Sequence, residues 1–262
     1  MTQYTDGVVA GMQMLYGEGF LSPGGASEVP DLVDGVEITG KSVLDIGCGL
    51  GGLAMMLVRE FDCGQVTAID IESDLIARAR SAVAAAGLQN RVAARCIEPG
   101  KLPFDDASFD IAVTKDVVCH VENKAAIFAE IRRILKPGGK LLLADFFDNR
   151  AQAGENAASL FDAYVAGMSA YGLNFHFQPF DTYREALTAG GLAINRHRDH
   201  TAASAAIAAR EHDILSGTDA DAIRAALGPD RFKARCEATE MRMRALEARG
   251  LLHGHVVAVK TA

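Results

Sequence analysis

The chain has 262 residues, of which 49% are hydrophobic and 23% charged, and its formal net charge is −8 at pH 7. This size and composition suit one α/β domain with a normal hydrophobic core. The negative charge repels phosphate backbones and anionic lipids, and no stretch approaches the roughly 20 apolar residues that span a bilayer. We therefore expect a small-molecule partner, with no nucleic acid and no membrane, while nothing in the sequence specifies an oligomeric state.

The cysteines and the N-terminus indicate a compartment. The five cysteines are odd in number and lack CxxC spacing, so they are typical of reduced thiols rather than of a disulfide framework or a zinc site. The first residues show no basic segment followed by an apolar run, so no signal peptide is expected. A cytoplasmic location follows as the prediction.

Short apolar segments alternate with helical patterns between residues 41 and 145. The pattern predicts strands at 41–46, 65–70, 92–96, 109–113 and 140–145, and helices at 53–61, 74–86 and 124–135. Ser73 is the candidate cap of the second helix, and the segment KPGG at 136–139 is a stop signal for the third. Such alternation with short links predicts a parallel sheet covered by helices on both faces.

Helices dominate after residue 150. They are predicted at 151–172, at 182–189 and repeatedly within 202–250, with an aromatic-rich loop at 174–180. A sixth strand is predicted at 192–198 and a final strand at 255–260. No internal repeat or linker interrupts the chain, so one domain with a helical insertion is the economical interpretation.

The first strand leads into the glycine-rich segment DIGCGLGG, residues 45–52. Glycines allow a tight turn and the close approach of a ligand to backbone amides. Asp70 ends the second strand, where a carboxylate can accept both hydroxyls of a ribose, and Glu98 follows the third, where it can accept from an adenine amino group. The spacing GxGxGG differs from the dinucleotide fingerprint, although an NAD site and a purely structural turn remain alternatives.

Four segments together resemble the class I S-adenosylmethionine-dependent methyltransferases. They are VLDIGCGLGG, the AID that ends at Asp70, LPFDDASFD at 102–110 and LKPGGKLLL at 135–143. The resemblance implies an α/β fold with a Rossmann-like seven-stranded sheet, in which only the last strand is antiparallel and pairs with the sixth. It also implies S-adenosylmethionine as the cofactor.

The N-terminal segment QYTDGVVAGMQMLYGEGFLSPGG, residues 3–25, and the segment KDVVCH, residues 115–120, are similar to phosphoethanolamine N-methyltransferases. That resemblance implies a lid over the cofactor, a catalytic latch of Tyr4 and His120, and contact between Asp116 and the acceptor amine. The expected cofactor-site residues are Gln3, Leu21, Ser22, Asp45, Gly47, Gly49, Asp70, Ile71, Glu98, Pro99 and Lys115.

The expected layout is a single methyltransferase domain over residues 1–262. Its parts are the lid at 1–25, the cofactor-binding core at 41–145, the substrate-side helices with the sixth strand at 146–250, and the last strand at 254–260.

The chemistry of amine methylation is consistent with these residues. An amine attacks the methyl carbon in its neutral form, so a group with a pKa near neutrality is suited to take its proton, and histidine is that group. A carboxylate such as Asp116 can hold the amine and balance the positive charge of the product.

The substrate side departs from the phosphobase enzymes. Phe146 stands where the family has a tyrosine, and Met168 where it has an arginine, whereas Tyr164 and Tyr171 match or lie close to family tyrosines. The basic residues Arg184, Lys233 and Arg235 are interpreted as parts of solvated helix faces. The acceptor is therefore expected to be smaller or less anionic than a phosphobase: another amine, an amino acid, a thiol or a thioether.

Three alternatives stay open. The first is methylation of a sulfur or carbon atom, and a thiolate or thioether acceptor need not have a base. The second is a regulator that binds S-adenosylmethionine without catalysis, and the third is an NAD-dependent oxidoreductase. The histidines other than His120 show no convincing ligand spacing, and His253 and His255 are expected to point to opposite faces of a strand. No metal is predicted.

Overall fold

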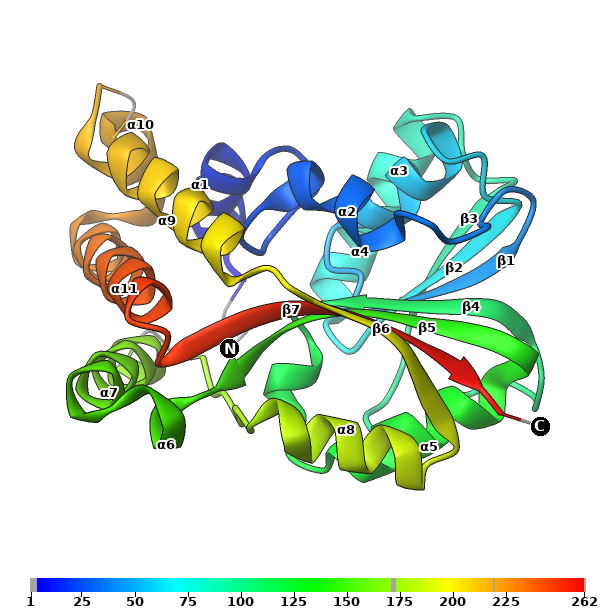
Figure 1. Cartoon of the computed structure of the whole chain (residues 1–262). Coiled ribbons are helices and arrows are strands. Elements are labelled where there is room, and N and C mark those ends of the chain that lie inside the picture. Colours follow the sequence, from blue (N-terminus) through cyan, green and yellow to red (C-terminus); the bar gives the residue numbers. More distant parts are fainter. Residues whose placement is uncertain (1–3, 171–172, 219, 262) are drawn as a thin grey trace.

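The computed structural model describes residues 4–170, 173–218 and 220–261. Within them the strands form one seven-stranded sheet in the order β3-β2-β1-β4-β5-β7-β6 (Figure 1). Strand β7 is antiparallel to β5 and β6, and the other neighbouring strands are parallel, so the expected class I arrangement is confirmed. The bounds are β1 (Ser42–Ile46), β2 (Gln65–Asp70), β3 (Val92–Cys96), β4 (Phe109–Lys115), β5 (Leu135–Asp148), β6 (Leu192–Asp199) and β7 (Leu251–Lys260).

Strand β5 is longer than the sequence predicts. It begins at Leu135, directly after a helix that ends at Ile134. The KPGG segment ends that helix as expected, but it lies within β5, where the pairing with β4 shifts register between Phe109 and Ile111. Gly138, with φ +73°, takes a left-handed conformation that suits glycine.

Helices cover both faces of the sheet. In Figure 1, α5 (Lys124–Ile134) and α8 (Phe180–Ala189) lie below it, and α2 (Val29–Val33), α3 (Gly52–Arg59) and α4 (Ser73–Ala85) lie above it. The prediction that Ser73 caps α4 is wrong, because the helix begins at Ser73 and its N-cap residue is Glu72, with no side-chain cap. In α5, by contrast, the Asn123 side chain accepts a hydrogen bond from the amide of Ala126.

The remaining helices gather where the parallel strands end, on the left of Figure 1. Helix α11 packs against α7 and α9, and α1 packs against α10. The helix expected over 151–172 is broken at Gly154, which has φ +86°. The bounds are α1 (Asp6–Tyr16), η1 (Gly25–Glu28), η2 (Val118–His120), α6 (Arg150–Ala153), α7 (Glu155–Ala170), α9 (Thr201–Ser216), α10 (Ala220–Leu227) and α11 (Pro229–Glu247).

The strands are buried on both faces, which explains their nearly continuous hydrophobic sequences. In β1, Val43 packs in one core cluster and the next residue, Leu44, in the other, since neighbouring side chains point to opposite faces. Both side chains are fully buried. The two faces of the sheet thus support two cores, and the strand ends are left for the site.

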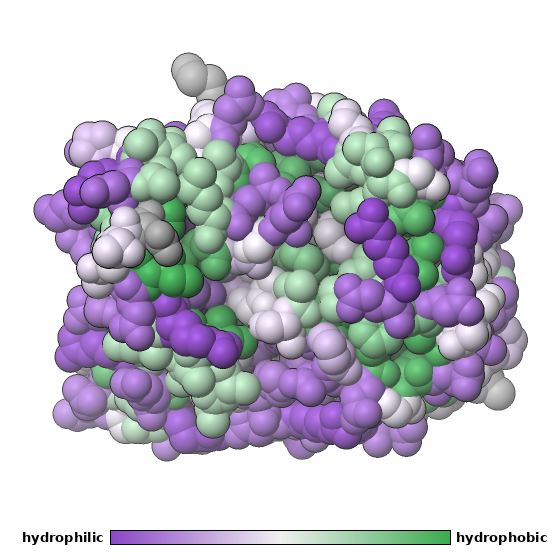
Figure 2. Space-filling model, turned by 90° about the horizontal axis from the view of Figure 1, so that it is seen from above, coloured by the Kyte–Doolittle hydropathy of each residue, from purple (hydrophilic) through white to green (hydrophobic). Residues whose placement is uncertain are grey.

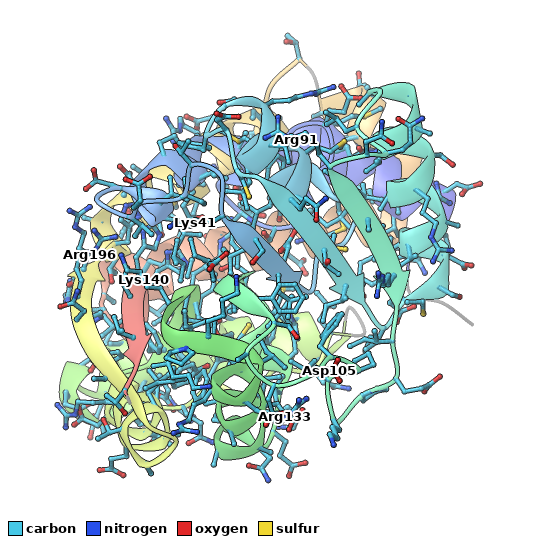
Figure 3. All side chains as sticks on the ribbon, turned by 90° about the vertical axis from the view of Figure 1, so that its right-hand side faces the viewer. Lys41, Arg91, Asp105, Arg133, Lys140 and Arg196 are labelled. Atoms are coloured by element: carbon cyan, nitrogen blue, oxygen red, sulfur yellow. The ribbon has the colours of Figure 1, made fainter. Side chains whose placement is uncertain are left out.

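Charged side chains surround the side of the sheet where the parallel strands begin, opposite the strand ends that are left for the site. Figure 3 looks onto the side where the parallel strands begin, with Lys41 before β1 and Arg91 before β3 labelled near that edge.

The face in Figure 2 mixes hydrophobic and hydrophilic residues without a broad hydrophobic area. Among the described residues, no helix combines the length and apolar character that crossing a membrane requires.

Candidate active site

The glycine loop is shaped by close contacts with other segments. Gly47, Gly49 and Gly51 all have positive φ, at +74°, +53° and +82°. A Cβ on Gly47 would lie 2.3 Å from a methyl carbon of Val117, and one on Gly52 would lie 2.5 Å from the carbonyl oxygen of Gly19. The loop thus requires glycine for its backbone and for its packing against the lid.

Two aspartates, Asp45 and Asp70, lie at the ends of β1 and β2 beside the glycine loop. The carboxylate of Asp70 accepts hydrogen bonds from the amide of Gly49 at 2.9 Å and from that of Glu72 at 3.0 Å, which fixes it beside the loop. Asp45 is buried, and burial, reinforced by the charge of Asp70, raises the pKa of Asp45 to about 7. The first helix after the loop, α3, directs its N-terminus here, where backbone amides favour ligand oxygens.

A cavity of about 1010 Å³ extends from the glycine loop to the substrate-side helices. Most of the expected site residues that the structure describes line it: Tyr4, Leu21, Ser22, Asp45, Gly47, Gly49, Asp70, Ile71, Pro99, Lys115, Asp116, His120, Phe146, Tyr164 and Met168. Glu98 is exposed and is not among the lining residues, although Ile97 and Pro99 on either side are. Gln3 and Tyr171 lie outside the described residues.

His120 is exposed to the cavity at the end of η2. Its Nδ1 lies 2.8 Å from the carbonyl oxygen of Asn174, and its ring stacks on Phe175 with centroids 4.4 Å apart. A carbonyl oxygen can only accept, so Nδ1 carries the proton and Nε2 is the basic nitrogen of the neutral ring. Desolvation lowers the pKa of His120 more than the bond to Asn174 raises it, which favours the neutral ring.

Asp116 directly follows β4 and has φ +57°, an uncommon backbone conformation for an aspartate. Its carboxylate is 2.6 Å from the Lys115 ammonium and 3.2 Å from Nε2 of His253. Burial raises the pKa of Asp116, but the charge of Lys115 and the bond from His253 outweigh it, so the pKa lies below its usual value. Asp116 is therefore an ionised group at the cavity wall.

Arginines line the cavity near the predicted acceptor residues. Arg235 and Arg242, both in α11, are 4% exposed. Arg235 donates a hydrogen bond to the Tyr16 hydroxyl at 3.2 Å, and Arg242 forms an ion pair with the buried Glu211. Tyr164 is also buried at this wall, and its burial raises its pKa.

The expectation of a solvated helix face is wrong for Arg235. It holds for Lys233 and Arg184, whose side chains are 78% and 54% exposed. Arg235 and Arg242 are seven residues apart and thus share one face of a helix, but this spacing does not show which face is buried. Because both arginines lie far from the glycine loop in sequence, they were not expected to line the same cavity.

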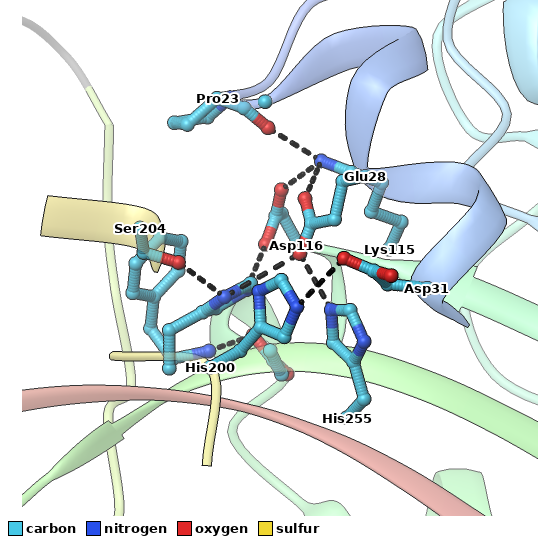
Figure 4. A network of polar contacts seen from close by, with 12 residues as sticks. Pro23, Glu28, Asp31, Lys115, Asp116, His200, Ser204 and His255 are labelled. Carbon is cyan, nitrogen blue, oxygen red and sulfur yellow. Dashed lines mark hydrogen bonds and ion pairs between the residues drawn. The ribbon is translucent and has the colours of Figure 1, made fainter. Parts of the chain in front are cut away.

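The expectation for the two C-terminal histidines is also wrong. His253 and His255 point to the same face of β7, because side chains two residues apart in a strand share a face. Both are buried, and both contact Glu28: Oε1 of Glu28 lies 2.7 Å from Nε2 of His255 and 3.4 Å from Nδ1 of His253. Glu28, the last residue of η1, thereby contacts the last strand (Figure 4).

Known proteins resemble the chain over these parts. Residues 44–143 match the methyltransferase domain family. Phosphoethanolamine N-methyltransferase 3 of Arabidopsis thaliana is 33% identical over 145 residues, which is 55% of this chain and 29% of the plant protein. Phosphoethanolamine N-methyltransferase 2 of Caenorhabditis elegans is 30% identical over 167 residues, 63% of this chain and 37% of the relative. The chain thus spans well under half the length of these relatives.

A solved structure matches the whole fold. Haemonchus contortus phosphoethanolamine N-methyltransferase 2, in complex with phosphomonomethylethanolamine and S-adenosylhomocysteine, has a TM-score of 0.86 at 24% sequence identity. The match covers 100% of this chain and 58% of that one. The chain thus has a methyltransferase domain match over residues 44–143 and the fold of the class I methyltransferases, and it is similar to the phosphoethanolamine N-methyltransferases.

Proposed function

We propose that the chain transfers a methyl group from S-adenosylmethionine to the amine nitrogen of a small molecule that also carries an anionic group. The observation that carries the proposal is one continuous cavity, which joins the glycine loop and Asp70 to His120, Asp116 and Arg235. The relatives' names, with phosphoethanolamine as acceptor, are consistent with an amine and an anion in one molecule.

The cofactor would occupy the half of the cavity next to the glycine loop. Asp70 would accept from the ribose hydroxyls with the lone pairs that its two backbone bonds leave available. Asp45, which is buried and has a pKa raised to about 7, would support the glycine loop at its first residue. Tyr4 and Leu21 would cover the cofactor from the lid, because both line the cavity and pack together against Leu50.

Methyl transfer breaks the bond from sulfur to the methyl carbon and forms a bond from the acceptor nitrogen to that carbon. The sulfonium becomes a neutral thioether, and the amine must lose a proton before or after the transfer. His120 would take this proton at Nε2, because its Nδ1 is held by Asn174 and its lowered pKa keeps it neutral. The ionised Asp116 would hold the cationic forms of the amine.

The anionic end of the acceptor would face Arg235 and Tyr16. Arg235 would take the role of the arginine whose expected place is occupied by Met168, because both residues line the same cavity although they lie in different helices. A buried guanidinium binds carboxylate and phosphate oxygens in a geometry that suits both groups. The acceptor class is therefore an amine with a phosphate or a carboxylate.

A product screen tests the proposal. The protein is incubated with methyl-labelled S-adenosylmethionine and with phosphoethanolamine, glycine, ethanolamine and a small thiol, and the products are identified by mass spectrometry. We expect labelled N-methyl products from the acidic amines and little from ethanolamine, which lacks the anion. Labelling of the thiol alone would overturn amine methylation in favour of sulfur methylation. S-adenosylhomocysteine should raise Tm in a parallel experiment, and an unchanged Tm would contradict the cofactor site.

A further inference from the structure

A buried polar network lies directly behind Asp116. We call Glu28, Lys115, Asp116, His253 and His255 the Glu28 network. The side chain of Asp116 is 7% exposed, and the other four residues are each at most 8% exposed. Lys115 holds both carboxylates, at 3.0 Å from Glu28 and 2.6 Å from Asp116. The members come from η1, the end of β4 and β7, and Lys115 also donates to Ser22 and Pro23 in the N-terminal segment (Figure 4).

His253 contacts the Asp116 carboxylate and is not itself among the residues that line the cavity. Its Nε2 lies 3.2 Å from Oδ1 of Asp116, and its Nδ1 lies 2.7 Å from the Ser204 hydroxyl and 3.4 Å from Glu28. The ring also packs on Phe146, with centroids 4.3 Å apart. Partners at both nitrogens and at one ring face leave the imidazole a single orientation.

The cluster also has the composition of a metal site, because ligand atoms of Glu28, His200, His253 and His255 lie within 4.8 Å of one another. The arrangement of the rings argues against one. His200 and His255 stack with centroids 4.0 Å apart and an interplanar angle of 17°. A metal ion binds close to the plane of each imidazole that ligates it, and two parallel stacked rings cannot both meet that condition. The contacts are those of hydrogen-bonded ion pairs.

We propose that His253, oriented by Glu28 and Ser204, is a positioning residue that fixes the Asp116 carboxylate toward the acceptor and keeps it ionised. This inference rests on the proposed function, in which Asp116 holds the amine. The left-handed backbone of Asp116 makes such support necessary, because a strained residue keeps its conformation only when its surroundings determine it. Lys115 holds one carboxylate oxygen and His253 the other.

The charges around His253 support this role. Burial lowers the pKa of His253, but the Glu28 charge and the bond to Asp116 raise it above its usual value. A protonated His253 with Lys115 balances the two carboxylates. The titratable and charged groups that face His253 from the surrounding elements are Glu28, Lys115, Asp116, His200, Arg242 and His255.

Substitution of His253 by Gln tests the role in turnover. With saturating S-adenosylmethionine and phosphoethanolamine as the probe acceptor, we expect the acceptor KM of the variant to rise about tenfold while kcat changes less. The affinity for S-adenosylhomocysteine should stay within about twofold, because His253 is not among the residues that line the cavity. The matched control is His197→Gln on β6, an exposed histidine that stacks on Phe180, which should change neither value.

A second measurement does not depend on an acceptor. Histidine side-chain NMR should show a His253 resonance with a proton on Nε2, and Asp116→Asn should shift it. Glu28→Gln should lower the titration midpoint of His253 by about one pH unit. Ser204→Ala should shift the Nδ1 signal and raise the acceptor KM less than His253→Gln does, which covers the case in which the larger change disturbs folding.

The outcomes separate the two proposals. An unprotonated Nε2, or a His253 midpoint that does not respond to Glu28→Gln, would overturn the positioning role whatever the acceptor is. A normal NMR response in a protein that methylates no acidic amine would instead contradict the proposed function. One equivalent of zinc or another transition metal in the purified protein, lost with a fall in Tm on chelation, would replace the hydrogen-bonded network with a metal site.

Discussion

The half of the cavity proposed to bind the cofactor (the cofactor half) and the half proposed to bind the acceptor (the acceptor half) are built in different ways. The cofactor half consists of β1, the glycine loop and the end of β2, and its contacts are mostly between backbone and neighbouring segments, such as the bond from Gly49 to Asp70. The half proposed to bind the acceptor is assembled from α1, η2, α7 and α11, whose residues are up to 219 positions apart in the bond between Arg235 and Tyr16. One half is specified by local motifs and the other by packing between distant helices.

This difference makes each half a separate target. A change in the cofactor half should alter cofactor affinity and leave the preference between acceptors as it is. A change in the acceptor half should alter turnover or acceptor KM and leave the affinity for S-adenosylhomocysteine as it is. The substitutions in the cavity described next test whether the two halves respond independently.

The largest effect is expected from His120→Asn. Loss of the base should lower kcat for an amine acceptor about 100-fold, with S-adenosylhomocysteine affinity unchanged, because general bases contribute about 10²–10⁴ in rate. Steady-state kinetics measure the first quantity and calorimetry the second. His212→Asn in α9, half-buried and absent from the cavity wall, is the control. Full turnover in the His120 variant would contradict the base role.

Asp70→Ala should act on the cofactor half. It removes two acceptors for ribose hydroxyls and the bond that holds Gly49, so we expect calorimetry to show about 30-fold weaker S-adenosylhomocysteine binding. Asp74→Ala, an exposed acid in the first turn of α4, should bind normally. Equal affinity of the Asp70 variant and the wild type would remove Asp70 from the cofactor site.

Arg235→Met should act on the acceptor half. We expect the KM for an acidic amine to rise about tenfold, since a charged hydrogen bond is lost and the apolar part of the side chain is kept. The exposed Lys233→Met in the same helix is the matched control. If both variants respond alike, general charge rather than a specific contact attracts the acceptor.

The last prediction concerns stability and Asp145, which is fully buried and accepts from the Tyr183 hydroxyl at 3.2 Å. Burial, with a smaller contribution from Asp116, raises the pKa of Asp145 to about 7 from a usual 3.8. The native state therefore binds more protons than the unfolded state between these values, and stability falls as pH rises through that window. Asp145→Asn should reduce this loss by roughly 1–3 kcal/mol.

Thermal unfolding between pH 4 and pH 8 measures that change, with the exposed Asp105→Asn as the control. The slope of Tm against pH should become shallower for the Asp145 variant and stay as in the wild type for the Asp105 variant. Identical slopes in all three proteins would mean that Asp145 titrates normally.

The sequence by itself determined the sheet and the glycine loop. Alternating strands and helices, positive-φ glycines and an acid at a strand end are local features, because backbone sterics and burial on both faces act within a few residues. The positions of Gly47 and Asp70 at strand ends therefore follow from the local pattern alone. The ends of elements were less certain, as the start of α4 at Ser73 and the early start of β5 at Leu135 show.

Only the tertiary structure determined which residues line the acceptor half of the cavity and which form the Glu28 network. Arg235 has the sequence context of a solvated face, and Glu28 that of an ordinary loop acid. Their burial depends on how α11 and η1 pack against the rest of the fold, and such packing joins residues that no local pattern relates. A charged side chain enters a buried site only where partners from other elements compensate the loss of water, as His253, His255 and Lys115 do for Glu28.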